Sequence, residues 1–173
     1  MKFSINPSHT GTHIAKNGRR VNIVTAENGK DYESEAAFLT AMGIQPLALF
    51  VAKQTAIADL QQAHEKSLRD GITPDGAAFV LPAEIEWQNK FTGMVTLLQT
   101  ALLAASNKAG RDAILAAPSV IPDKTGAIHP ITNQDLLSLL SSYGQKIQTK
   151  EVVLATKQAG IAAATSVSEL APK

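Results

Sequence analysis

The sequence has no cysteine, few aromatic residues (5% of 173) and no long hydrophobic run. The absence of cysteine excludes disulfides, thiolate zinc sites and cysteine nucleophiles. No stretch approaches the roughly 18 consecutive apolar residues that a membrane-spanning helix needs. The first residues also lack the basic and apolar regions of a secretory signal. We therefore expect no membrane partner, and synthesis in a cytoplasm.

Charge is scarce and almost balanced, with 18% charged residues and a formal net charge of +1. Nucleic acids and anionic membranes attract proteins that carry a clear excess of positive charge. We therefore expect no nucleic acid as a partner. Hydrophobic residues make up 45% of the chain, an ordinary globular composition. The length suits either one core or a small module beside a helical one, and we expect two units.

The longest regular pattern covers residues 133–165, which contain no proline. Thr132 suits the N-cap of a helix here, and Asp135 suits its third position. Such a helix is on the order of 50 Å long, so it predicts either an antiparallel partner helix within the chain or copies from other chains. Apolar residues recur along it at steps of four and three, as in a coiled coil, with Lys150 at one step. They form the predicted self-association seam: Leu136, Leu140, Tyr143, Ile147, Leu154 and Ile161.

Residues 1–45 are predicted to form a small attachment module that contains β-structure. The composition of residues 1–18 is typical of an irregular arm. Alternation over residues 20–25, followed by Asn28-Gly29, predicts a small hairpin or edge strands with positive φ at the turn. Ser34 and Gly43 suit the two caps of a short helix. The residues expected to dock on a partner are Phe3, Ile5, Arg19 and Arg20.

Residues 46–173 are predicted to form a helical oligomerisation unit. Helices are expected over residues 47–70 and from Pro82 to about residue 107, then the long helix and a short last turn at residues 167–170. A hairpin is expected on each side of the second helix, at residues 72–81 and 110–132. The buried positions of the second hairpin are expected to be Val120, Ile121, Ile128 and Ile131. The predicted fold class is therefore α+β and predominantly helical, with three helices, two short hairpins and the small β-containing module.

The four histidines give little support for a metal site or a catalytic base. His9 and His13 have the spacing of two ligands on one helical face, but the residues between them form helices poorly. His64 lies on the apolar face of its helix, where a boundary histidine with a local hydrogen bond is expected. His129 lies beside a proline, and turn chemistry accounts for it. We expect no bound metal.

Two further groups have an ordinary structural interpretation. Glu84 and Glu86 are two residues apart, so on a helix they point in different directions rather than sharing acid–base work. Trp87 and Phe91 could stack on a sugar, but they share a stripe with core residues. The chain has no Gly-x-Ser-x-Gly elbow and no phosphate-binding glycine loop, and the basic run Lys16, Arg19 and Arg20 suits an acidic protein partner. We expect no enzyme activity, catalytic residue or cofactor.

The order of parts from about Val51 to Leu170 carries a resemblance to a known domain. The residues concerned include Leu68–Ile72, Asp75-Gly76 followed by Phe79, a helix after Pro82, Gln134–Leu137 at a helix start, Ala162–Thr165 and Ser168–Leu170. In this order they resemble a domain of unknown function near the C-terminal end of tail-fibre and tail-associated proteins of tailed bacteriophages. Here Pro118–Pro122 replaces a strand with a Trp-Lys pair, and Thr125-Gly126 replaces an Asp-Gly turn.

The resemblance implies a structural virion component of a tail fibre or baseplate, made in the host cytoplasm. It also implies a homo-oligomer, commonly a trimer, that docks on other tail proteins, and it transfers no catalytic residue. A tail-fibre assembly chaperone that leaves the finished particle is the first alternative. A small hydrolase of cell-envelope sugars, with Glu84 or Glu86 as the acid, is the second.

Overall fold

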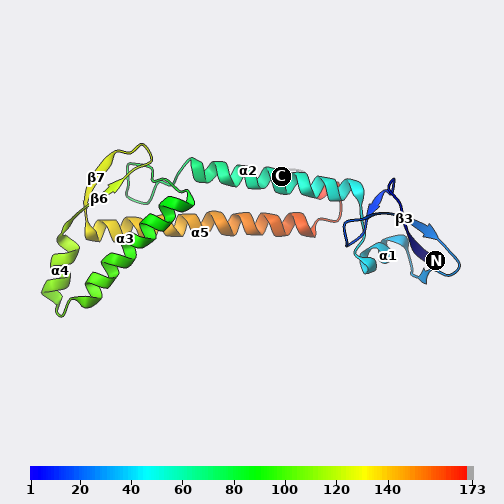
Figure 1. Ribbon diagram of the computed structural model, residues 1–173, viewed down its shortest axis with the longest axis horizontal. Helices are drawn as coiled ribbons and strands as arrows, with labels where there is room; N and C mark the ends of the chain where they lie inside the picture. The colour runs from blue at the N-terminus through cyan, green and yellow to red at the C-terminus, as the bar shows by residue number, and fades with distance from the viewer. Residues whose placement is uncertain (171–173) are drawn as a thin grey trace. The chain divides into compact units, whose positions relative to one another are not determined.

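The computed structural model describes residues 1–170 and confirms an α+β, mostly helical fold (Figure 1). The chain forms two compact units, residues 1–60 with the chain after residue 156, and residues 61–156. The division falls within α2 (Leu47–Arg69) and within α5 (Asn133–Ala163). It differs from the expected boundary at residue 45, because the helix that follows Pro46 begins inside the first unit.

The first unit contains a five-stranded antiparallel sheet in the order β4-β1-β3-β2-β5. The central pair is β1 (Lys2–Pro7) and β3 (Arg20–Thr25), which pair from Phe3 opposite Thr25 to Pro7 opposite Val21. The expectation of an irregular arm over residues 1–18 is therefore wrong. Phe3 and Ile5 alternate with polar residues, as a strand with one buried face requires. The short strands are β2 (His13–Ile14), β4 (Lys30–Asp31) and β5 (Gln45–Pro46).

Gly11 and Gly29 allow close contact between backbone segments of the first unit. A Cβ atom on Gly11 would lie 2.5 Å from the carbonyl oxygen of Val21, and one on Gly29 would lie 2.6 Å from that of Phe3. Neither Asn28 nor Gly29 has positive φ among the described residues, so the expected turn geometry at this pair is wrong. Glycine is required here because no side chain fits between the chain segments.

Helix α1 (Glu35–Met42) has the predicted caps. The Ser34 hydroxyl accepts a hydrogen bond from the Ala37 backbone N–H, and Gly43 has a left-handed backbone with φ 63°. Phe38 of this helix is buried and stacks on Phe3, with their ring centroids 5.4 Å apart. Phe3 is thus buried, and Ile5 packs against the same core. Assigning them to a docking surface was wrong, because their side chains fill the interior of this unit.

The second unit is built from α3 (Ile85–Ala104), α4 (Lys108–Ala116), a hairpin of β6 (Pro118–Pro122) and β7 (Ile128–Thr132), and the parts of α2 and α5 within residues 61–156 (Figure 1). Leu81 and Ile121 are fully buried at its centre. The other buried members of its core are Ile72, Ala83, Phe91, Leu136, Leu140 and Tyr143.

This core corrects the expected self-association seam. Leu136, Leu140 and Tyr143 are buried inside their own unit, and Ile147 packs against the same core. Leu154 and Ile161 are half-buried. The first part of the stripe therefore faces the chain's own helices and cannot meet another copy in this fold.

The long helix begins as predicted. The Thr132 hydroxyl donates to the Asp135 carboxylate at 2.7 Å and accepts from the Asp135 backbone N–H at 3.1 Å. In the second unit α5 runs antiparallel to the end of α2, because Glu151 meets His64 while Lys150 meets Ser67. The helix therefore has a partner within the chain, which was one of the two predicted alternatives.

Several connections differ from the expected ones. Residues 72–81 form a single bridge, Ile72 to Leu81, rather than a hairpin, and α3 begins three residues after Pro82. Helix α4 was not expected; Asn107 caps it by accepting from the Gly110 N–H at 2.8 Å. The β6–β7 hairpin is present, but two of its expected buried residues, Val120 and Ile128, are 53% and 59% exposed. The short last turn is a 3-10 helix, Val167–Leu170.

None of the helices within residues 1–170 has the length and apolar character needed to cross a membrane.

Candidate functional site

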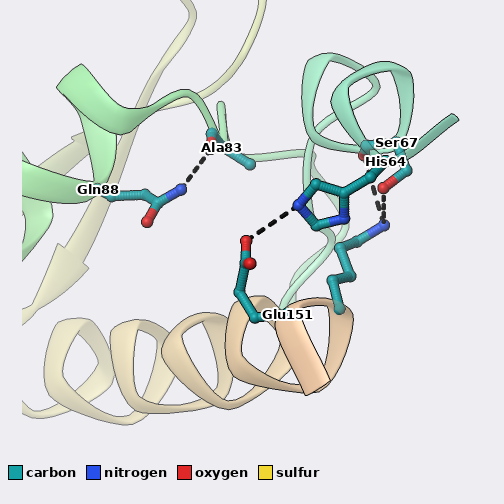
Figure 2. Close-up of polar contacts among 6 residues, drawn as sticks. His64, Ser67, Ala83, Gln88 and Glu151 are labelled. Carbon is teal, nitrogen blue, oxygen red and sulfur yellow. Dashed lines mark hydrogen bonds and ion pairs between the residues drawn. The ribbon is translucent and has the colours of Figure 1, made fainter. Parts of the chain in front are cut away.

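His64 on α2 and Glu151 on α5 form a polar pair between two helices that are distant in sequence. The His64 Nε2 atom lies 3.0 Å from Glu151 Oε1, and the side chains are 13% and 52% exposed. Figure 2 shows the imidazole extending from α2 toward the carboxylate on α5. The expected hydrogen bond of His64 is therefore present, but its partner is on another helix rather than local.

Lys150, the residue before Glu151, forms a second contact between the same two helices. Its ammonium donates to the Ser67 hydroxyl at 3.1 Å and to the Ser67 carbonyl oxygen at 3.4 Å. Nearby, the Gln88 side chain donates to the Ala83 carbonyl oxygen at 2.7 Å (Figure 2). The His64–Glu151 and Lys150–Ser67 contacts join α2 to α5, so these four residues form a helix-to-helix clamp. The Gln88–Ala83 bond only ties α3 to the segment just before it.

A second histidine–carboxylate pair closes the turn of the β6–β7 hairpin. His129 Nε2 lies 2.9 Å from Asp123 Oδ2, and the His129 ring stacks on Phe79 with 3.8 Å between centroids. The other Asp123 oxygen accepts from the Thr125 hydroxyl and from two backbone N–H groups, of Thr125 and Ala127. These hydrogen bonds, that of His129 foremost, hold the pKa of Asp123 well below its usual value. His129 itself lies on β7 opposite Ile121, and its bond to Asp123 ties that strand to the turn.

The carboxylates at the start of α3 are separated by their own contacts. Glu84 occupies the N-cap position, whereas Glu86 pairs with Lys90 at 2.7 Å. The Lys90 ammonium also lies 4.3 Å from the centroid of the Trp87 ring and lowers the pKa of Glu86. Phe91 is buried, as expected. This arrangement does not bring the two carboxylates into one site.

In the first unit, Arg19 and Arg20 are exposed and line a pocket of about 630 Å³ with Pro7, Ser8 and His9. The Arg20 guanidinium donates to the His9 carbonyl oxygen at 3.4 Å. His13 lies on β2, where Nδ1 is 3.1 Å from the hydroxyl of its neighbour Thr12. No group of three or more possible metal ligands occurs within residues 1–170.

The outward side of α3 is uncharged over most of its length. From Phe91 to Asn107 the sequence has no charged residue, although an exposed helix face normally carries charges. Leu97 and Leu103 are 74% and 87% exposed. We call this surface the α3 outer face; its members are Asn89, Thr92, Gly93, Thr96, Leu97, Thr100, Leu103 and Ala104.

A groove lies along each side of this face. The first, of about 320 Å³, runs between α3 and α5, with Val95 and Thr96 on one wall and Gly144 and Ile147 on the other. The second, of about 360 Å³, lies between α3 and the α4–β6 segment and includes Leu97 and Ile114. Both expose apolar side chains to solvent.

The hairpin adds a further uncharged surface. Because cross-strand partners point to the same side, Val120 shares a face with Pro130, and Pro122 shares it with Ile128. Val120 and Ile128 are the exposed large residues of this outer side. Both sides of the hairpin carry large aliphatic residues, Ile121 and Ile131 on one and Val120 and Ile128 on the other, which is why the sequence pattern did not tell buried from exposed positions.

The sequence already held a signal for the α3 outer face in its long uncharged stretch. The spacing of apolar residues does not show which side of α3 is exposed, since leucines occur on both sides of this helix.

Comparison with known proteins finds no matching family model, no matching curated protein and no matching solved structure.

Proposed function

We propose that this protein is a structural component of a bacteriophage tail, in a fibre, a baseplate or their attachment, and acts by oligomerisation and docking on other tail proteins. The observation that carries the oligomerisation role is the uncharged, leucine-bearing outer face of α3. Large exposed apolar surfaces mark sites of protein association. The phage assignment is supported by the resemblance of residues 51–170 to phage tail domains, and a trimer is favoured.

The polar groups of the second unit support a mechanical role. The clamp of His64, Glu151, Lys150 and Ser67 connects α2 to α5, and the Asp123–His129 pair fixes the hairpin turn. Each reinforces the scaffold that presents the apolar surfaces. The protein would then act by holding other proteins in a fixed arrangement rather than by catalysing a reaction.

Quantitative mass spectrometry of purified phage particles, compared with the infected lysate, tests the proposal. A tail component remains in the particles through density-gradient purification at a constant ratio to other tail proteins. Abundance in the lysate together with loss from the particles contradicts a virion role and favours the assembly chaperone. The exposed pair Arg19 and Arg20 supplies a second readout: Arg19→Ala with Arg20→Ala should reduce incorporation if the first unit attaches to an acidic partner.

A further inference from the structure

We propose that the α3 outer face is the surface through which copies of this chain bind one another. The inference rests on the proposed function, because it assigns the self-association of that proposal to particular residues. It also replaces the α5 seam, whose first half is buried in the chain's own core. The occupant of the face is a second copy of the same helix with its flanking grooves.

The three threonine hydroxyls of this face already donate to backbone carbonyl oxygens of α3. The Thr92 hydroxyl donates to the Gln88 carbonyl oxygen at 2.8 Å. The next two threonines repeat the pattern, with Thr96 donating to Thr92 and Thr100 donating to Thr96. Their methyl groups are therefore left to face outward beside Gly93 and Leu97. A neighbouring apolar surface could cover these residues without leaving a hydroxyl donor unpaired.

The absence of charge restricts the partner to an uncharged surface, which a second copy of the face provides. In a self-association, equivalent side chains come close together, so a charge would often meet its own kind. The α3 outer face avoids that repulsion completely between Phe91 and Asn107. An acidic or basic partner would lose hydration there without gaining an opposite charge. The partner surface must therefore be uncharged, and the α3 outer face of a second copy meets that requirement.

The shape of the surface leads to the same partner. Leu97 and Leu103 protrude, and grooves of about 320 and 360 Å³ lie on the two sides of the helix. A leucine of one copy can enter a groove of the next, as knobs enter holes between packed helices. Protrusion and recess thus occur on the same element, which makes the surface complementary to itself.

The size of the surface indicates how much of it takes part. A helix of this length spans about 30 Å and is about 10 Å wide, so its face alone offers a few hundred Å². A stable interface buries roughly 800 Å² on each partner. The groove walls must therefore be covered as well, including Ile147 on α5 and Ile114 on α4.

Sedimentation velocity of the full chain and its variants tests the inference. Leu97→Lys with Leu103→Lys puts charges on the face while keeping good helix formers. Val152→Lys, at a residue of α5 that is 57% exposed, is the matched control in the same unit. We expect the double variant to raise the dissociation constant by at least about thirtyfold, and the control to leave it unchanged. An unchanged dissociation constant in the double variant overturns the inference.

Disulfide cross-linking is a second test, and it does not require the charged variants to fold. The chain has no cysteine, so one introduced thiol gives an unambiguous report. Thr100→Cys on α3 and Thr156→Cys on α5 are matched, because both threonines are exposed and donate to the carbonyl four residues earlier. We expect the α3 variant to form covalent dimers much faster. Equal rates overturn the inference.

The outcomes separate this inference from the proposed function. An oligomer that survives the α3 substitutions, or a wild-type chain that is monomeric, overturns the α3 interface. Retention of the chain in purified particles would then still support a structural tail role through contacts with other proteins. Loss from the particles together with an α3-dependent oligomer would contradict the tail role and leave the interface standing.

Discussion

The phenolic oxygen of Tyr143 lies 2.9 Å from the carbonyl oxygen of Pro82, to which it donates a hydrogen bond. The ring also meets Phe91 edge-on, with centroids 5.2 Å apart. One side chain of α5 thereby holds both the segment that leads into α3 and the core face of α3. Tyr143 consequently orients α3 with its uncharged side outward.

Removing this hydroxyl should weaken the second unit. Tyr143→Phe leaves the buried Pro82 carbonyl without its partner, a change that costs about 1–3 kcal/mol of unfolding free energy. We expect a lower denaturant midpoint with an unchanged slope of unfolding free energy against denaturant. A midpoint equal to that of the wild type would show that the hydrogen bond contributes nothing.

The same phenol predicts a loss of stability at alkaline pH. Burial, together with the negative charge of Glu84, raises the pKa of Tyr143 to about 12, whereas a phenol in the unfolded chain titrates near 10. Below pH 10 the phenol is neutral in both states, and its contribution to stability is complete. As pH rises from 10 to 12 only the unfolded chain ionises, so this contribution is lost. Tyr143→Phe should lack this part of the alkaline decline.

Spectroscopy can isolate that titration, because the chain has only two tyrosines. In a Tyr32→Phe variant, phenolate absorbance reports Tyr143 alone. We expect its midpoint close to pH 12 in the folded protein. A midpoint near 10 with the fold intact would contradict the burial of the phenol.

Asp123 predicts the opposite behaviour at acid pH. Its pKa is lowered in the folded state, by the His129 hydrogen bond first, so the carboxylate stabilises the hairpin above pH 4, where it is ionised in both states. That contribution is lost as pH falls below 4, because protons then bind the unfolded chain preferentially. Asp123→Asn should therefore be less stable than the wild type at pH 7, and the difference should shrink in acid. A difference that stays constant from pH 7 to pH 3 would argue against a role for the charge.

A pair of glycines separates backbone strain from steric overlap. Gly71 and Gly76 both have positive φ, at 86° and 79°. A Cβ atom on Gly71 would lie 2.5 Å from Val80 Cγ1 and 2.7 Å from the Leu81 carbonyl oxygen, whereas one on Gly76 would meet nothing within 4 Å. Gly76→Ala should cost about 1–2 kcal/mol from conformation alone. Gly71→Ala should cost more in thermal or chemical unfolding, and equal costs would contradict the tight packing at Gly71.

The sequence was informative where a local pattern determines structure. The caps of α1 and the start of α5 follow from Ser34, Gly43 and the Thr132–Asp135 pair, and each was predictable. The strand β1 was missed because only its pairing with β3 shows why Phe3 is buried. Local composition does not reveal a partner strand some twenty residues away.

The candidate surface was harder to predict for a related reason. Leucines on α5 and α3 have similar spacing, but only tertiary packing decides which stripe is covered. Leu136 and Leu140 of α5 are buried in the core, whereas Leu97 and Leu103 of α3 are exposed to solvent. Missing charge between Phe91 and Asn107 is a better guide to the open face than the spacing of apolar residues.

Association of this chain with its own copies is the central claim, and the mass of the native 173-residue chain in solution tests it most directly. Light scattering after size exclusion, over a range of concentrations, should give a whole multiple of the 18.3 kDa chain, with three copies favoured. A single mass of 18.3 kDa at every concentration would contradict the claim.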